Sequence, residues 1–278
     1  MSAAPGEREY VLGTSDDEVW RLGFQHRVWA VEAFQIWRRA GFAPGQTLLD
    51  VGCGPGWGTV DLAHIAGPQG GRVIAVDESQ KFLDLMRERL SPFEASVIDA
   101  RHGDIQRLDL PAESVHGAYI RWVLCFVADP EAVIAAVARA LAPGAAVAIQ
   151  DYFNYTSLTL APKGPALARV VAAVEKSWRA RGGDCDIMGR VPAMCRRHGL
   201  EVDEIRPHVR VARPGTLLWK WPEVFFGPHA RILAQNGFLE AADVAAYEAE
   251  WSARSADPAS YFMTPPVIDV IARKRAPA

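Results

Sequence analysis

A glycine-rich turn is the most chemically informative stretch of this 278-residue chain. Gly52, Gly54 and Gly56 alternate within residues 48–59, directly after an apolar run. Because glycine has no Cβ atom, it adopts positive φ and lets a ligand lie against bare backbone. The amide groups that open a following helix then offer hydrogen bonds to a carboxylate or a phosphate. The pattern predicts a strand, a turn that cradles a ligand, and a helix N-terminus.

The spacing of these glycines differs from that of dinucleotide-binding turns. In the G-x-G-x-x-G fingerprint the third glycine would fall on Trp57, counted from Gly52, or on Thr59, counted from Gly54. The sequence Asp50-x-Gly-x-Gly-x-Gly instead resembles motif I of the class I S-adenosylmethionine (SAM)-dependent methyltransferases. The resemblance implies that this aspartate and the three glycines bind the cofactor SAM.

Two acids at later strand ends extend the resemblance. Asp77 closes a β-rich run 27 positions beyond Asp50 and matches the family position where a carboxylate accepts the ribose hydroxyls. Asp104 follows another apolar run and matches the position that accepts the adenine amino group. The resemblance assigns Glu78 and Ile105, which adjoin these acids, to the same cofactor site.

Two further segments complete the match. An apolar stretch over residues 115–126 includes Arg121, also assigned to the cofactor, and precedes a helix over residues 131–141. Another strand is predicted over residues 144–151. Any one of these glycines or aspartates could merely close a turn, but five motifs in order over about residues 45–152 are a specific signal. The resemblance implies an α/β fold, with a Rossmann-like seven-stranded sheet and helices on both faces.

A helical cap is predicted ahead of this core. The capping box at residues 15–18 places acids at the positive end of a helix dipole, and the helix is expected to run to Arg39 or Ala40. Tyr10 and Gln25 resemble an N-terminal element of many small-molecule methyltransferases, in which a tyrosine and a glutamine close over the methionine end of SAM. Alternatively, Tyr10 only packs and Gln25 is a solvated helix residue.

Beyond the core, the pattern predicts helices over residues 165–181 and 191–198 and strands over 201–211 and 266–274. The two strands resemble the sixth and seventh strands of the family's sheet, of which the seventh is antiparallel. The whole chain is expected to form a single methyltransferase domain. Its parts are a cap (1–41), a SAM-binding core (45–152), the rest of the sheet with its helices (153–215 and 263–278) and a helical lid insertion (216–262).

The insertion is rich in aromatic residues. It holds nine of the 26 aromatics of the chain: Trp219, Trp221, Phe225, Phe226, Phe238, Tyr247, Trp251, Tyr261 and Phe262. Two short helices are expected here, one starting at Pro222 and ending at Asn236-Gly237, the other over residues 240–253. Most of these rings must attach the insertion to the sheet, but one or two are expected to face an acceptor. The insertion and residues 10–25 are expected to close over the site, with hinges at Gly13 and at the Pro214-Gly215 turn.

The chemistry asked of such a protein is modest, because the sulfonium of SAM already activates the methyl group. Positioning is the main task, and a general base is needed only for a hydroxyl, an enol or a carbon acid. Candidate catalytic residues are Asp151 and Tyr152, where the fifth strand ends, and His26. His208 and His229 are further candidates, and each histidine could instead be a packing or surface residue.

Composition limits the partners. The net charge of −3 lacks the basic surplus that nucleic acid requires, so a small-molecule acceptor is expected and a homodimer is left open. No apolar stretch of about 18 residues suggests a membrane segment, and the N-terminus lacks an apolar signal core, so a cytoplasmic location is expected. The four cysteines form no C-x-x-C pair, and Cys185, Cys195 and His198 fit no zinc signature, so no metal is expected.

Two other functions compete with methyl transfer to a small molecule. One is a SAM-binding protein that does not methylate, such as a cofactor-gated cyclase or a regulatory module on the same scaffold. The other is a nucleic-acid methyltransferase, although residues 150–153 do not form the Asn/Asp-Pro-Pro-Tyr-type motif that holds an exocyclic amine. The sequence does not distinguish an oxygen, nitrogen or carbon acceptor.

Overall fold

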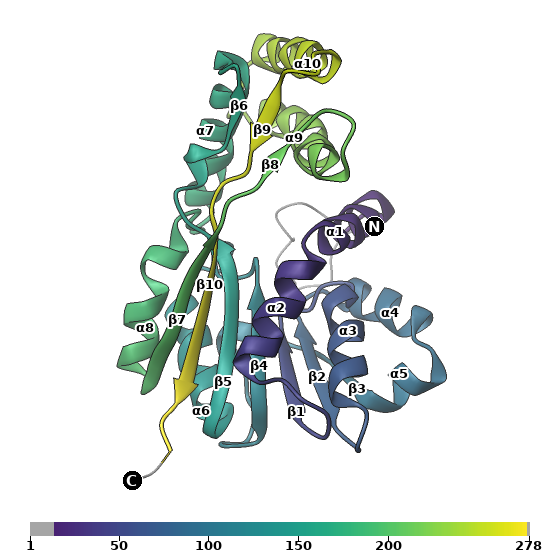
Figure 1. The fold of residues 1–278 in the computed structure, drawn as a ribbon, viewed down its shortest axis with the longest axis vertical. Coiled ribbons are helices and arrows are strands. Elements are labelled where there is room, and N and C mark those ends of the chain that lie inside the picture. Colours follow the sequence, from purple (N-terminus) through teal and green to yellow (C-terminus); the bar gives the residue numbers. More distant parts are fainter. Residues whose placement is uncertain (1–13, 277–278) are drawn as a thin grey trace.

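The computed structural model describes residues 14–276 and contains a seven-stranded sheet with helices on both faces (Figure 1). The strand order is β3-β2-β1-β4-β5-β10-β7, and β10 runs opposite to the other six strands of this sheet. The predicted fold class and the predicted antiparallel last strand are confirmed. The strands of this sheet are β1 (Thr47–Val51), β2 (Arg72–Asp77), β3 (Ile98–His102), β4 (Val115–Arg121), β5 (Leu141–Tyr152), β7 (Leu200–His208) and β10 (Val267–Lys274).

The central strands are buried on both sides, which explains their nearly continuous apolar sequences. One face packs against α2, α3 and α4, and the other against α6 and α8. The helices are α1 (Asp16–Val28), α2 (Ala30–Ala40), α3 (Trp57–Ala66), α4 (Gln80–Arg89), α5 (Pro92–Val97), α6 (Pro130–Ala140), α7 (Pro165–Ala180), α8 (Val191–Arg197), α9 (Leu217–Gln235) and α10 (Ala241–Ala256). None of the helices in residues 14–276 is long and apolar enough to cross a membrane.

The predicted single helix of the N-terminal cap is wrong, because the chain breaks at Trp29 into α1 and α2. Trp29 has φ −110° and ψ 15°, and its amide donates to the carbonyl oxygens of Gln25 and His26. Its buried indole packs edge-on against Trp122 and Trp221, with ring centroids 5.9 and 5.3 Å apart. The break lets α2 pack on β5 and β10 while α1 lies over the carboxyl ends of the parallel strands (Figure 1).

The insertion between β7 and β10 contains two helices as predicted, but α9 begins earlier than expected. Thr216 caps it by accepting a hydrogen bond from the amide of Trp219 at 3.3 Å, so Pro222 lies inside the helix and not at its start. The helices have 19 and 16 residues and are therefore not short. Figure 1 shows both helices above the end of the sheet where the parallel strands finish.

A second, three-stranded sheet was not predicted. Its order is β6-β9-β8, formed by β6 (Thr159–Ala161), β8 (Val211–Ala212) and β9 (Tyr261–Met263). Each strand has only two or three residues, too few for a recognisable alternation of apolar and polar side chains. The sheet joins the chain after β5 to both ends of the insertion and so fixes α9 and α10 above the main sheet.

Candidate active site

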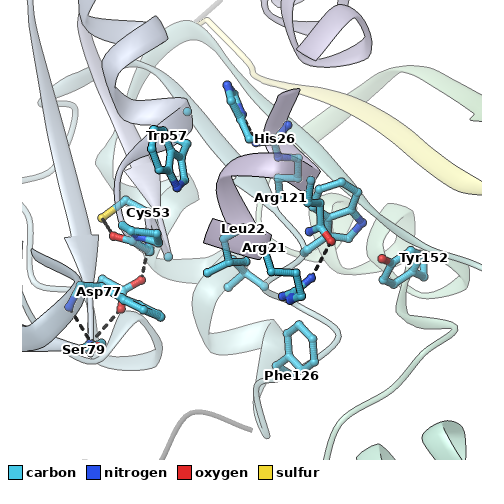
Figure 2. Close-up of a pocket in the computed structure, with 18 of the residues that line it drawn as sticks. Arg21, Leu22, His26, Cys53, Trp57, Asp77, Ser79, Arg121, Phe126 and Tyr152 are labelled. Carbon is cyan, nitrogen blue, oxygen red and sulfur yellow. Dashed lines mark hydrogen bonds between the residues drawn. The ribbon is translucent and has the colours of Figure 1, made fainter. Parts of the chain in front are cut away.

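A cavity of about 780 Å³ opens at the carboxyl ends of β1, β2 and β4. Strand order reverses between β1 and β4, and ligands of open α/β sheets bind at such a switch point. The lining comes from the glycine turn, the three strand ends and helices α1, α7 and α9. Figure 2 shows side chains of α1, the glycine turn and the strand ends around one space.

The three glycines of the turn all have positive φ, as predicted, but for different reasons. A Cβ atom on Gly52 would lie 2.5 Å from Cγ2 of Val123, and one on Gly56 would lie 2.1 Å from Sδ of Met86. A Cβ atom on Gly54 would meet nothing within 4 Å. Packing therefore requires two of the glycines, whereas the third leaves open space where a ligand can approach the backbone.

Asp77 lies at the end of β2 on the cavity wall. Its Oδ2 accepts a hydrogen bond from the amide of Gly54 at 2.7 Å, and its Oδ1 accepts one from the amide of Ser79 at 2.9 Å. Burial raises the pKa of this carboxyl group. A carboxylate oxygen has two lone pairs, so each oxygen keeps acceptor capacity for a ligand hydroxyl. Glu78, also predicted at the cofactor, lines the same wall.

Asp50 and Arg121 both line the cavity, and their contact with the cofactor stays a prediction. Oδ2 of Asp50 accepts a hydrogen bond from the Thr59 hydroxyl at 2.7 Å, which ties the end of β1 to the first turn of α3. Burial raises the pKa of Asp50 to about 6. The guanidinium of Arg121 lies over the ring of Trp122, 5.1 Å from its centroid.

His26 lines the cavity, but its ring nitrogens are both occupied. Nη2 of Arg121 donates to Nδ1 at 2.5 Å, and Nε2 lies 2.8 Å from Oδ2 of Asp61. Since arginine only donates, Nδ1 is the acceptor and Nε2 carries the proton that Asp61 accepts. Burial lowers the pKa of His26, which favours this neutral form. The geometry therefore assigns His26 to orienting Arg121 and does not support the predicted role as a catalytic base.

Asp151 and Tyr152 were predicted as a catalytic pair, but their side chains lie in different surroundings. Asp151 is fully buried, and its carboxylate accepts hydrogen bonds from the amides of Val123 and Cys125, both at 3.2 Å, and from the amide of Tyr152 at 2.8 Å. Burial raises its pKa to about 6. Asp151 does not line the cavity, whereas Tyr152 does. The hydrogen bonds of Asp151 hold the loop after β4, and they favour a structural role over the predicted catalytic one.

Of the two residues predicted near the adenine, Ile105 lines the cavity and Asp104 does not. Oδ1 of Asp104 accepts a hydrogen bond from the amide of Gln106 at 2.9 Å and so caps the 3-10 turn Ile105–Arg107. Ile105 and Gln106 line the cavity, and Asp104 is not among the lining residues. An adenine contact by Asp104 stays a prediction. Tyr10 lies outside the described residues.

Gln25 joins the cap to the insertion. Its Oε1 accepts hydrogen bonds from Nη1 of Arg21 at 3.1 Å and from Nε1 of Trp221 on α9 at 3.2 Å. Arg21 also forms a buried ion pair with Glu18 at 2.6 Å. Gln25 is buried, so the alternative of a solvated helix residue is wrong. These contacts bring the two predicted lid segments together over the cavity.

Aromatic side chains form the half of the cavity farther from the glycine turn. Four of the nine insertion aromatics line it, more than the one or two expected: Trp221, Phe225, Phe226 and Phe262. Phe126, Tyr155 and Trp178 also line it, although none of them was predicted as a site residue. Phe126 and Tyr155 could have been predicted from their positions in the sequence, because each follows shortly after the end of a strand that carries a cofactor motif.

Comparison with known proteins places the core in a family. Residues 49–149 match the family model described as Methyltransferase domain. A 2-phytyl-1,4-naphtoquinone methyltransferase from Synechococcus elongatus is 35% identical over 127 residues, which are 45% of this chain and 53% of that protein. The chain therefore spans about half the length of this relative.

Solved structures share the fold over a longer range. A SAM-dependent methyltransferase from Aquifex aeolicus superposes with a TM-score of 0.53 at 18% identity, covering 69% of this chain and 92% of that one. The [4+2]-cyclase SpnF superposes with a TM-score of 0.57 at 17% identity, covering 88% and 81%. The matched core, the strand order and the glycine turn at the switch point show that this chain belongs to the class I SAM-dependent methyltransferase family.

Proposed function

We propose that this protein is a SAM-dependent methyltransferase that acts on a small-molecule acceptor. The observation that carries the proposal is the continuity of the cavity, which runs from the glycine turn and Asp77 at one end to a chamber of aromatic rings at the other. The end at the glycine turn has the groups to bind a nucleoside. The aromatic end can bind an apolar acceptor, which must lie beside the cofactor for methyl transfer. Its volume of about 780 Å³ is within the range of small-molecule sites.

The residues of the cofactor end fit SAM. The backbone at Gly54 is open to the cavity, so a ligand can lie against it. The two oxygens of Asp77 retain acceptor capacity for a ribose diol, and Ile105 offers an apolar surface for a base. When bound, SAM supplies a methyl group that is activated by its sulfonium and that an acceptor displaces in line.

The protein's contribution to this chemistry is mainly positional. Both nitrogens of His26 and both oxygens of Asp151 are engaged within the protein, so neither is poised to take a proton from an acceptor. Holding two reactants near contact distance can supply several kcal/mol of the barrier reduction. Closure of the cap and the insertion around bound ligands would exclude water, which strengthens electrostatic interactions inside the site. Tyr152 is the predicted catalytic residue that remains in contact with the acceptor half.

The acceptor half comes largely from outside the matched core. Trp178, Trp221 and Phe225 lie beyond residues 49–149, as do Arg21 and Tyr155. Proteins with this fold include one named for a naphthoquinone and one named as a cyclase, so the core alone does not select the reaction. The acceptor is therefore decided by the cap, the segment after β5 and the insertion.

Calorimetry with SAM, followed by a search for S-adenosylhomocysteine (SAH) release with a panel of small oxygen, nitrogen and carbon nucleophiles, tests the proposal. We expect SAM to bind and at least one acceptor to cause stoichiometric SAH release. Failure to bind SAM would overturn the proposal. Binding without SAH release from any acceptor would favour a SAM-binding protein that does not transfer the methyl group. Sedimentation in the same buffer tests whether the protein is a homodimer.

A further inference from the structure

Two buried tyrosines line the acceptor half of the cavity. Tyr152 and Tyr155 are 6% and 4% exposed, and both line the cavity. Within residues 14–276 neither hydroxyl has a hydrogen-bond partner, and Figure 2 shows the hydroxyl of Tyr152 directed into the open space. Tyr119 differs, because its hydroxyl donates to Oε1 of Gln150 at 2.6 Å. Tyr247 differs too, because its unpartnered hydroxyl is sealed inside the protein.

The two tyrosines form one unit. Their ring centroids are 5.0 Å apart with an interplanar angle of 74°, so the two rings pack edge-on against each other on the cavity wall. Burial raises the pKa of each phenol well above its ordinary value, so both groups stay protonated and can donate. A buried tyrosine hydroxyl normally finds a hydrogen-bond partner. A ligand atom that accepts hydrogen bonds would satisfy these two.

The walls around the hydroxyls are flat and aromatic. Trp122 stacks on Tyr152 with ring centroids 6.0 Å apart and an interplanar angle of 28°. Trp178 lies 5.4 Å from the ring of Tyr155 and 4.6 Å from the ring of Phe126. Aromatic walls of this kind favour a planar aromatic ligand, because another ring can pack on them in an offset-stacked or edge-on arrangement.

The charged side chains of the acceptor half do not suit a cationic ligand. Its carboxylates, within the described residues, are Asp50, Asp77 and Glu78, all next to the glycine turn. The charged residues of the acceptor half are Arg21 and Arg181. Among residues 14–276, an ammonium group would therefore find no carboxylate on this part of the wall, whereas an oxygen atom would find the tyrosine hydroxyls as donors.

We propose that Tyr152 and Tyr155 form the acceptor subsite and donate hydrogen bonds to an oxygen atom of a planar aromatic acceptor of the phenol class. This inference rests on the proposed function, since it assumes that the ring lies beside the cofactor end of the same cavity. The hydroxyls select the oxygen and the stacked rings select planarity. Tyr152 and Tyr155 are thus residues that determine specificity, and their hydroxyls orient the acceptor.

Three probes and three variants test the subsite by equilibrium dialysis against SAH-saturated protein. The probes are 2-naphthol, naphthalene, which lacks the oxygen, and decahydro-2-naphthol, which lacks the planar ring. In the wild type we expect 2-naphthol to bind about 3- to 10-fold more tightly than naphthalene, the ratio expected for one neutral hydrogen bond. We expect decahydro-2-naphthol to bind more weakly than 2-naphthol.

The variants Tyr152→Phe and Tyr155→Phe keep the ring and remove the hydroxyl. Each should bring the 2-naphthol to naphthalene ratio toward one, while the affinity for naphthalene changes by less than about twofold. Tyr261→Phe is the matched control, because Tyr261 is 43% exposed on β9 and does not line the cavity. It should keep the wild-type ratio.

Equal binding of the three probes by the wild type, or an unchanged ratio in both cavity variants, would overturn the subsite. The affinity for SAH is measured separately on every protein. If SAH fails to bind, the proposed function fails. If SAH binds but the ratio is one in the wild type, only the phenol-class subsite fails.

Discussion

At the scale of single residues, the acids of this site differ in what they accept. Asp77 takes one amide on each oxygen and keeps lone pairs toward the cavity, whereas the three amides on Asp151 turn its carboxylate away from it. A charged hydrogen bond contributes about 1.5–3 kcal/mol. The position of an acid relative to the cavity, and not its residue type, decides whether it can bind a ligand.

Asp77→Ala should weaken SAM binding by about 1.5–3 kcal/mol, because the variant loses charged acceptors for the ribose hydroxyls. Calorimetry on the folded variant measures the loss. Asp99→Ala is a matched control, since Asp99 follows the start of the neighbouring strand β3 and pairs with the exposed Arg101 at 2.6 Å. SAM affinity equal to that of the wild type in Asp77→Ala would refute the ribose assignment.

Asp50 makes stability depend on pH. Burial raises its folded-state pKa from 3.8 to about 6, so the folded protein holds this proton more tightly than the unfolded chain. The resulting stabilisation is fully present below the unfolded pKa and is lost as pH rises through the folded pKa. Between pH 4 and pH 7.5 the loss is about 2 kcal/mol by linkage.

Asp50→Asn removes this titration while keeping the shape of the side chain. The free energy of unfolding of the variant, minus that of the wild type, should therefore increase by about 2 kcal/mol from pH 4 to pH 7.5. Urea unfolding at several pH values measures the difference. A difference that stays constant over this range would show that Asp50 titrates alike in the folded and unfolded states.

At the scale of elements, one buried carboxylate links α2 and the strands β5, β7 and β10, between the last two of which the insertion lies in the sequence. Asp269 on β10 is fully buried and accepts from Arg39 of α2 at 2.5 Å and from Gln150 of β5 at 2.7 Å. Nε2 of His208 on β7 lies 2.8 Å from it. Gln150 in turn accepts from Tyr119, which lines the cavity. The network connects four elements to the site.

Asp269→Ala should destabilise the fold by about 1–3 kcal/mol, because the buried amide of Gln150 loses its acceptor, while the half-buried Arg39 keeps Glu204 as an ion-pair partner. Asp203→Ala, which breaks the exposed 3.0 Å pair with Arg273 on the same strand pair, should cost no more than about 1 kcal/mol. Denaturant unfolding compares the two variants. Similar losses in both would mean that the network contributes little beyond a surface pair.

At the scale of the whole molecule, the cap and the insertion meet over the cavity. Gln25 of α1 hydrogen-bonds Trp221 of α9, and Trp29 packs between Trp122 and Trp221. The insertion has few direct contacts with the main sheet and is held through α1, α7 and the small sheet. Local opening of such a region costs less than global unfolding. Closure of these segments around bound ligands stays a prediction.

Hydrogen exchange should show this closure. SAM should slow exchange in residues 16–25 of α1, and SAM with an acceptor should slow it further in α9, because each ligand adds contacts to the segment that covers it. Helix α5, which does not line the cavity, serves as the internal reference. Unchanged exchange in both segments at saturation would return their aromatic residues to a purely structural role.

The sequence alone determined the core of this protein. Glycine at the turn, an acid at the end of β2 and apolar runs for β1, β2, β4 and β5 follow from local requirements: positive φ, strand burial and helix capping. Such requirements act within a few residues, so they can be recognised from the sequence alone. The strand order and the position of the cofactor end at the switch point follow from them by family resemblance.

The tertiary structure alone decided which side chains meet. Successive residues of a strand point to opposite faces, so Tyr152 enters the cavity while Asp151 turns to the loop after β4. The engagement of His26 by Arg121, 95 positions away, has no local signal. The acceptor chamber likewise gathers Phe126, Tyr155 and side chains of α7 and α9 from separate segments. Their meeting depends on how the helices pack over the sheet, because burial against distant elements and not local spacing selects those contacts.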